Sequence, residues 1–306
     1  MRKAFNEELL KAARQDKRIH MILADIGYGE IEPFANEFPE RFINCGVAEQ
    51  NMTGVACGVA LAGNIAITYS IANFPTLRCL EQVRNDVCYH NANVKIVIIG
   101  GGMAYGPLGV SHHSTEDLAI MRALPNLKVI APCDIYEARS AVHAMLAYDG
   151  PVYYRCGYKG EKNLHTGPVN FEIGKALKLR EGKDAAIIFT GTIGINALHA
   201  ADELEKQGYS IKLISMHTIK PIDVAAVLDA AETGCVVTLE EHNICGGMGG
   251  AVAEALMDNG AGNIRFRRMA LPDVNVCKIG SEEWLRDQYG LGVADIVSTV
   301  KSLVKK

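Results

Sequence analysis

The sequence lacks the features that mark several classes of protein. Its 306 residues hold 31 basic against 35 acidic side chains, a net charge of −4, with no dense Lys/Arg stripe, so nothing favours a nucleic-acid partner. The nine cysteines are odd in number, and no two have CxxC spacing. Buried thiols in a reducing cytoplasm explain them better than a disulfide framework or a zinc site.

No uninterrupted apolar run is long enough for a membrane span. The stretch from Gln50 to Leu77 carries no charge, but glycine, asparagine and proline interrupt it. We expect a buried helix that runs into a buried strand there, and no membrane partner. Met1 is followed directly by Arg2 and Lys3 and then by polar residues, which does not fit a secretion signal.

Short apolar runs alternate with helix-like stretches along most of the chain. The expected strands lie at 20–23, 65–69, 94–99, 127–130, 152–154, 185–189, 211–215 and 236–239. The expected helices lie at 2–13, 50–61, 76–88, 135–147, 193–207, 223–232, 250–257 and 281–289. Strands that are apolar throughout and alternate with helices predict parallel sheets covered on both faces.

The character of the sequence changes after Arg155. Residues 157–170 hold three glycines, a proline and several polar side chains, a composition typical of a linker. We therefore predict an α/β protein with two doubly wound, mainly parallel-sheet domains. The first domain is expected at 1–157, the linker at 158–172 and the second domain at 173–306.

Glu49 is the only charged residue between Arg41 and Arg78. Among uncharged neighbours its carboxylate would lose hydration, which favours an acid that holds or shares a proton near neutral pH. A helix expected to begin near Ala48 has the opposite effect, because the positive end of its dipole stabilises the ionised form. Composition alone leaves both interpretations open.

A histidine pair and two glycine-rich segments are the other candidates. His112 and His113 follow the glycine-rich passage at 100–109, and neighbours on an extended chain face opposite ways, so at most one enters a site. A solvated polar loop is the simpler explanation, and no third ligand supports a metal there. The glycines at 100–102 and 246–250 could hold an anion through backbone N–H groups, although tight turns explain them equally simply. The EEH segment at 240–242 is better explained as a domain or subunit contact.

A set of short motifs resembles one enzyme family. GVAEQN at 46–51 resembles the G-[IV]-A-E-Q-[NH] segment of the transketolase family, and other matches follow in the family's order. They are RKA at 2–4, AD at 24–25, SHH at 111–113 against T-H-Q, RALPNL at 122–127, APCD at 131–134, MHTIKPID at 216–223, EEH at 240–242, GGMGG at 246–250 and ALPD at 270–273. Together they span nearly the whole chain and are specific as a set.

The resemblance implies a thiamine diphosphate enzyme in which Glu49 is catalytic. In the family, a carboxylic acid at a ring nitrogen of the cofactor's aminopyrimidine promotes the imino tautomer, and a water-poor setting suits that proton sharing. Phe74 matches the aromatic residue that stacks on the pyrimidine. Asp25 matches a cofactor-side acid, and Ile71 is assigned to the same cofactor site.

The resemblance also implies substrate contacts. His112 matches the catalytic histidine that hydrogen-bonds the substrate's oxygens, and Arg2 and Arg155 match two arginines that hold a substrate phosphate. The sequence departs from the family at three substrate positions, where Gly29, Gly100 and Leu108 replace a serine, a histidine and an acid. The substrate is then expected to be an unusual ketose, such as one with a sulfonate or a branched carbon skeleton.

A family domain is missing from this chain. Full-length members carry an N-terminal diphosphate-binding domain with a G-D-G…N metal motif, and no G-D-G occurs here. The resemblance therefore implies the C-terminal subunit of a split transketolase, a cytoplasmic enzyme that transfers a two-carbon ketol unit from a ketose to an aldose. A partner chain is expected to supply the diphosphate site and Mg²⁺, in an α₂β₂ assembly, and this chain is expected to supply no metal ligand.

Three alternatives remain open. The β subunit of a 2-oxo-acid dehydrogenase's decarboxylating component has the same two domains, and a deoxyxylulose phosphate synthase-like condensation uses the same cofactor. The RALPNL run, the EEH segment and Arg155 favour transketolase over the dehydrogenase subunit. A degenerate regulatory subunit is the non-enzyme alternative, and retention of Glu49, Phe74 and His112 argues against it.

Overall fold

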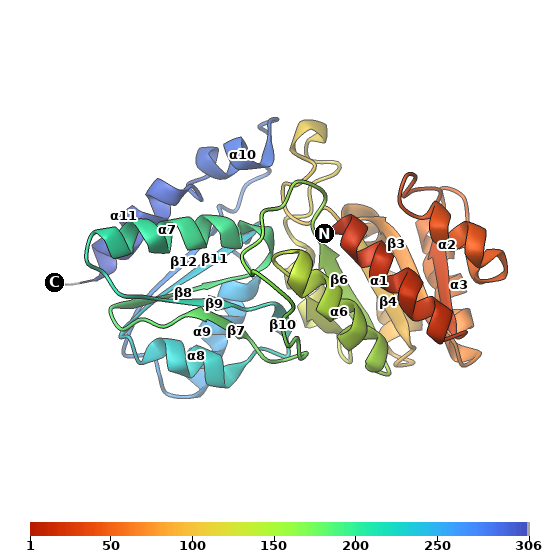
Figure 1. Ribbon diagram of the computed structural model, residues 1–306, viewed down its shortest axis with the longest axis horizontal. Helices are drawn as coiled ribbons and strands as arrows, with labels where there is room; N and C mark the ends of the chain where they lie inside the picture. The colour runs from red at the N-terminus through yellow and green to blue at the C-terminus, as the bar shows by residue number, and fades with distance from the viewer. Residues whose placement is uncertain (305–306) are drawn as a thin grey trace.

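Strands that are buried on both faces build two mostly parallel sheets. The computed structural model describes residues 1–304, and its two α/β domains lie side by side along the long axis of the molecule (Figure 1). The predicted fold class, two doubly wound domains with mainly parallel sheets, is thereby confirmed.

The first sheet has seven strands in the order β10-β5-β6-β4-β3-β1-β2. Its strands are β1 (Ile19–Leu23), β2 (Phe42–Asn44), β3 (Ile65–Ile71), β4 (Val94–Ile99), β5 (Lys128–Ile130), β6 (Val152–Cys156) and β10 (Thr218–Lys220). All neighbours pair in parallel except β10, which runs antiparallel to β5. β3, β4 and β6 are buried along almost their whole length, as the continuous apolar runs predicted.

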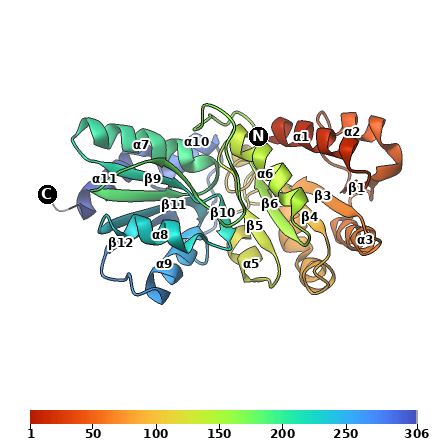
Figure 2. The same ribbon diagram turned by 60° about the horizontal axis from the view of Figure 1, so that its bottom comes forward.

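Helices cover both faces of this sheet. Figure 2 shows α1 and α6 on one side and α3 and α5 on the other. The bounds of the helices in this domain are α1 (Arg2–Gln15), α2 (Glu32–Glu37), α3 (Glu49–Leu61), α4 (Leu80–Gln82), α5 (Asp117–Ala123) and α6 (Ile135–Ala147). Each face has its own apolar core, because the strands present apolar side chains to both sides.

The helical stretch predicted at 76–88 is present, but it is not a single α-helix. The structure instead has two π-helical segments, Phe74–Arg78 and Val83–Cys88, on either side of the short α4. Pro75 stands at the start of the first segment, and a chain that bonds from i to i+5 winds wider than an α-helix. Phe74 and Arg78, four residues apart, lie on the same side of the segment.

The second sheet has five strands in the order β12-β11-β8-β9-β7. They are β7 (Leu177–Arg180), β8 (Ala185–Phe189), β9 (Ile211–Ser215), β11 (Cys235–Asn243) and β12 (Arg265–Leu271). Only β7, at the edge, is antiparallel. Helices α7 (Gly194–Lys206) and α11 (Val293–Leu303) cover one face, and α8 (Val224–Ala231) and α9 (Met248–Asp258) cover the other (Figure 1). The short α10 (Glu282–Gln288) lies beyond the sheet, near the first domain.

Strand β10 links the two halves of the chain. It follows β9 in sequence, yet it pairs with β5 of the first sheet, and one apolar core runs from the α3 face of the first domain to the α8 and α9 face of the second. The sequence analysis did not find this strand, because three residues are too few to show a periodic pattern. The domains therefore share structure as well as a linker.

The cysteines form no disulfide. All nine are free, and six of them are buried. None of the helices in residues 1–304 combines the length and the apolar character that crossing a bilayer requires.

Candidate active site

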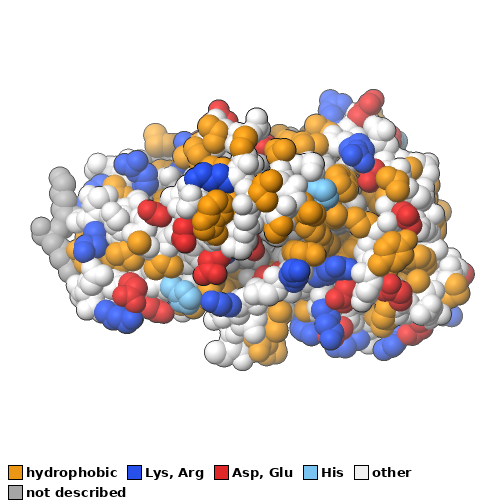
Figure 3. All heavy atoms as spheres, turned by 90° about the horizontal axis from the view of Figure 1, so that it is seen from above, with side chains coloured by type: hydrophobic (Ala, Val, Ile, Leu, Met, Phe, Trp, Pro, Cys, Tyr) orange, Lys and Arg blue, Asp and Glu red, His pale blue; other side chains and the backbone are white. Residues whose placement is uncertain are grey.

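The sequence-predicted residues of the cofactor site gather at one edge of the first sheet. Asp25 follows β1, Glu49 follows β2, and Phe74 follows β3, while Ile71 is the last residue of β3 and is half-buried. His112 lies in the loop after β4. These are the carboxyl ends of parallel strands, where α/β proteins place their ligand contacts. Figure 3, a view from above, shows hydrophobic side chains gathered over the middle of the molecule and across the first domain.

Glu49 begins α3 and is almost entirely buried, with 5% of its side chain exposed. Its position in the first turn places the carboxylate near the positive end of the helix dipole. The carboxylate is not isolated in space, however, because Arg78 Nη1 donates a hydrogen bond of 2.8 Å to Glu49 Oε2. Sequence analysis missed this pair, since 29 residues separate the two side chains.

Arg78 joins the acid to an aromatic ring. Its guanidinium carbon lies 5.0 Å from the centre of the Phe74 ring, and about half of its side chain is exposed. Arg78 ends the same π-helical segment that Phe74 begins. Arg78 therefore contacts both the Phe74 ring and the buried Glu49 carboxylate.

His112 and His113 point into different surroundings, although they lie in a turn rather than on the extended chain that the sequence suggested, because both backbone N–H groups donate to the Gly109 carbonyl oxygen. The half-buried His112 ring contacts Phe74 edge-on, with centres 5.5 Å apart, and lies 5.9 Å from Tyr105. Its Nδ1 is 3.0 Å from Ser111 Oγ. His113 is buried beside the backbone of Gly106, and neither of its ring nitrogens makes a well-formed hydrogen bond among the described residues. Burial lowers the pKa of His113, so it is neutral at physiological pH.

Asp25 is more exposed than Glu49. Its carboxylate accepts hydrogen bonds from Tyr28 Oη at 2.5 Å and from Asn44 Nδ2 at 3.0 Å, and these bonds hold its pKa below the usual range. Its φ of +51° places it in the left-handed region that aspartate tolerates better than most residues. The acid is therefore ionised and held by the loop that follows β1.

Arg2 holds this same loop against α1. Its Nη2 donates to the carbonyl oxygens of Gly27 and Tyr28 at 2.8 and 2.9 Å, and its Nε donates to Tyr69 Oη at 3.1 Å. These contacts are intramolecular. A phosphate would have to replace some of them, so the predicted phosphate contact of Arg2 stays a prediction.

Arg155 lies in the interior between the domains. Its Nε donates to Asp117 Oδ2 at 2.8 Å, and its Nη2 donates to the carbonyl oxygens of Ser114 and Glu241 at 3.0 Å each. The residue is only 6% exposed. The geometry gives no support to the expected phosphate contact, because this guanidinium is paired with a buried acid and faces protein oxygens. Arg155 instead ties the first domain to the second.

The first glycine-rich segment, at 100–102, packs against side chains of this chain and leaves no space there for an anion. A Cβ atom at Gly100 would overlap the Tyr105 ring, and one at Gly101 would come within 2.5 Å of Arg155 Nε. The three glycines at 100–102 therefore allow the close approach of Tyr105, Arg155 and Glu241.

The second glycine-rich segment, at 246–250, binds a carboxylate of this chain, that of Glu240. The backbone N–H groups of Met248 and Gly249, at the start of α9, donate to the two carboxylate oxygens of Glu240 at 2.6 and 2.8 Å. The neighbouring Glu241 accepts from Met103 N–H and from Arg286, and His242 Nε2 accepts from Ala119 N–H. The predicted domain contact at 240–242 is therefore present.

Two family models match this chain. "Transketolase, pyrimidine binding domain" matches residues 1–157, and "Transketolase, C-terminal domain" matches residues 174–296. The chain belongs to the transketolase family. This agrees with the motifs found in the sequence and with the position of Glu49 at the start of α3.

Relatives of similar length are single subunits of transketolases. The chain is 38% identical to a subunit of the apulose-4-phosphate transketolase of Phocaeicola vulgatus, covering 100% of this chain and 97% of that one. It is 37% identical to the 6-deoxy-6-sulfo-D-fructose transketolase subunit SqwH of a Clostridium species, covering 100% and 95%. A solved structure titled "Split gene transketolase, inactive beta4 tetramer" superposes with a TM-score of 0.88 at 37% identity and covers 99% of this chain and 97% of that one.

The sequence did not indicate two neighbours of the predicted residues, the charged Arg78 and the aromatic Tyr105. Arg78 reaches Glu49, and Tyr105 packs between Gly100 and His112. Arg78 could have been found as the first charge after the uncharged stretch, since a buried acid needs a partner. No comparable signal marks Tyr105.

Proposed function

We propose that this chain is the C-terminal subunit of a split, thiamine diphosphate-dependent transketolase that transfers a two-carbon ketol unit from a ketose to an aldose. The observation that carries the proposal is a buried carboxylic acid, Glu49, which Arg78 links to the partly exposed ring of Phe74 at the carboxyl ends of the strands of the first sheet. Homology to transketolase subunits of the same length supports it.

The residues present fit an aminopyrimidine. The guanidinium of Arg78 lies over Phe74 and donates an N–H to Glu49, so a planar group with N–H donors already contacts both residues, and an aminopyrimidine would take its place. Thiamine diphosphate, when bound, supplies the carbon nucleophile that stabilises the transferred fragment. Glu49 would hold a proton at a ring nitrogen of the pyrimidine, and Phe74 would orient the ring by stacking. Asp25 and Ile71 would flank it.

His112 is the substrate-side group in this proposal. Its ring lies beside Phe74 and is fixed by Tyr105 and Ser111, so it can hydrogen-bond the oxygens of a sugar bound over the cofactor. Arg2 would contact the substrate's anionic end after exchanging a carbonyl contact. Arg155 is left out of this set, because it is buried against Asp117.

The partner would be a chain that carries the diphosphate-binding domain and Mg²⁺, in an α₂β₂ complex in the cytoplasm. Exposed apolar side chains at this edge suit such a contact, namely Tyr28, Val47, Leu108 and Val110. The related β-chain tetramer is described as inactive, which supports a need for the partner.

The substrate is proposed to be an uncommon ketose with an anionic end. Relatives carry the names of enzymes for apulose 4-phosphate and 6-deoxy-6-sulfo-D-fructose. Gly29, Gly100 and Leu108 remove three polar side chains from the family's substrate positions, and a site with fewer hydroxyl-binding groups suits a deoxygenated or branched sugar.

Reconstitution tests the proposal. The chain would be mixed with the product of a gene that encodes a G-D-G…N domain, and ketose donors would be screened with aldose acceptors by mass spectrometry. We expect ketol transfer and Mg²⁺-dependent cofactor binding only in the mixture. Pyruvate decarboxylation by the mixture, or tight Mg²⁺-dependent cofactor binding by this chain alone, would overturn it.

A further inference from the structure

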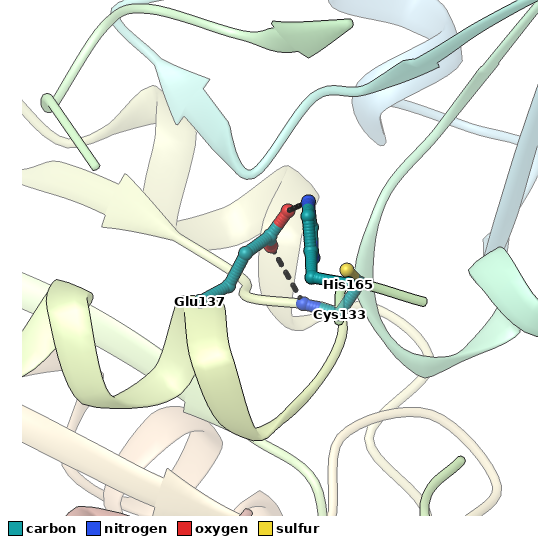
Figure 4. Close-up of side chains that lie close together, drawn as sticks. All are labelled: Cys133, Glu137 and His165. Carbon is teal, nitrogen blue, oxygen red and sulfur yellow. Dashed lines mark hydrogen bonds and ion pairs between the residues drawn. The ribbon is translucent and has the colours of Figure 1, made fainter. Parts of the chain in front are cut away.

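Three zinc-type ligands meet where the linker passes the start of α6. Cys133 precedes this helix, Glu137 lies in its first turn, and His165 belongs to the linker. One ligand atom from each lies within 4.8 Å of the other two. Figure 4 shows the His165 ring beside the Glu137 carboxylate, with Cys133 below them.

Asp134 fixes the orientation of His165. The Asp134 carboxylate accepts the backbone N–H groups of Leu164 and His165 at 2.9 and 2.8 Å, and its Oδ2 is 3.0 Å from His165 Nδ1. With Nδ1 occupied, Nε2 is the nitrogen that faces Glu137, 3.9 Å from its Oε1. A carboxylate behind a histidine is the usual way in which proteins orient a zinc-binding imidazole.

Glu137 directs one oxygen toward the cluster. Its Oε2 accepts the Cys133 N–H at 2.8 Å, whereas its Oε1 is fully buried and makes no hydrogen bond of ordinary geometry within residues 1–304. The Cys133 side chain is also fully buried. The Ser215 hydroxyl at the end of β9 lies within hydrogen-bonding reach of both side chains. Buried polar atoms normally have well-formed hydrogen bonds, and Glu137 Oε1, which has none within residues 1–304, can accept a ligand.

We propose that Cys133 Sγ, Glu137 Oε1 and His165 Nε2 bind a Zn²⁺ ion that fastens the linker to the first domain. A thiolate, an imidazole and a carboxylate are the ligand types zinc takes, and three of them leave a fourth position for water. Tetrahedral zinc places its ligand atoms about 3.3–3.8 Å apart, and the ligand atoms lie within 4.8 Å of one another, so they need to close by at most about 1.5 Å.

The proposal departs from the sequence-based expectation that this chain holds no metal ligand. His165 lies 28 residues after Glu137 and shows no ligand spacing with it. The cluster is formed by different residues from those proposed for catalysis. The zinc proposal can therefore be tested independently of the proposed transketolase activity.

The test uses the full chain, stripped of metal by dialysis against a chelator. Zn²⁺ would be titrated by calorimetry, and Co²⁺ would be added to a separate sample for absorption spectroscopy. We expect one ion per chain, a higher midpoint of thermal unfolding, and a Co²⁺ spectrum with tetrahedral bands and a thiolate-to-metal charge-transfer band. This spectrum from the unaltered chain does not depend on the folding of any variant.

Matched variants locate the ion. Cys133→Ser should abolish the charge-transfer band, His165→Gln should weaken Zn²⁺ binding at least tenfold, and Cys245→Ser, at an exposed cysteine, should change neither. Absence of a thiolate band in the unaltered chain would overturn the proposal. So would a band that survives in Cys133→Ser and disappears in Cys245→Ser.

Discussion

Arg78 donates a 2.8 Å hydrogen bond to Glu49 while its guanidinium lies over Phe74, so one side chain contacts both groups proposed to receive the cofactor's pyrimidine. About half of Arg78 is exposed, whereas Glu49 is buried. The guanidinium occupies the place where a pyrimidine ring would contact both groups. Arg78 must therefore move when the proposed cofactor binds.

Replacing Arg78 should strengthen cofactor binding in the reconstituted complex. Arg78→Met removes an ion pair worth about 0.2–1 kcal/mol, so the dissociation constant should fall by up to about fivefold. Calorimetric titration of the complex with thiamine diphosphate and Mg²⁺ measures this dissociation constant. Arg84→Met, at an exposed arginine that bonds Asn85, is the control and should bind as the unaltered chain does. Weaker binding in Arg78→Met would mean that Arg78 holds Glu49 in place instead.

Asp117 and Arg155 should contribute strongly to stability. Both side chains are buried, and the Asp117 carboxylate also accepts the Tyr153 hydroxyl at 2.9 Å. Asp117→Asn leaves the Arg155 charge uncompensated and should lower the free energy of unfolding by about 3–5 kcal/mol. Urea denaturation measures the loss. Asp16→Asn, which breaks a surface pair with Arg18, should cost less than about 1 kcal/mol. An equal loss of unfolding free energy in the two variants would refute the view that the buried Arg155–Asp117 pair stabilises the contact between the domains.

Lys95 should make stability depend on pH. Its ammonium donates to the carbonyl oxygens of Tyr148 and Gly150 at 2.6 and 2.7 Å, and burial lowers the pKa of Lys95 to about 7. Between pH 7 and about 10 the unfolded chain binds a proton that the folded chain does not, so the free energy of unfolding should rise with pH. Below pH 7 both states are protonated, and this slope should vanish.

The pH dependence can be assigned with two variants. Lys95→Met should lose the rise between pH 7 and about 10 in a series of denaturation curves. Lys128→Met is the matched control, because Lys128 contacts the same Tyr148 ring but is half-buried and should keep the rise. An identical slope in Lys95→Met and the unaltered chain would contradict the assignment to Lys95.

Most of the fold was predictable because its strands are apolar over their whole length. Runs such as 94–99 and 185–189 are short, apolar and bounded by turn residues, which is typical of strands buried on both faces, and the structure has β4 and β8 there. Elements that carry no such signal were missed. β10 has three residues, and β7 and β12 are only partly buried, so neither shows a continuous apolar run.

The candidate site was predictable residue by residue but not in its contacts. The sequence marks Glu49 as an acid among uncharged neighbours, and the structure buries it. No local sequence pattern indicates that Arg78 hydrogen-bonds Glu49 or that Arg155 pairs with Asp117. Both pairs depend on how segments distant in sequence come together in the fold. The motif match gave Arg155 the same expected role as Arg2, and only the surroundings of each guanidinium separate them.

Glu49 is the residue on which the proposed mechanism depends most, and ketol transfer by the reconstituted complex carrying Glu49→Gln tests its role most directly. Glutamine keeps the shape but cannot hold the proton, so the rate should fall by about 10²–10⁴-fold while thermal unfolding and assembly with the partner stay unchanged. Glu205→Gln, at an exposed glutamate of α7, should retain the full rate. An unchanged rate in Glu49→Gln would contradict the account.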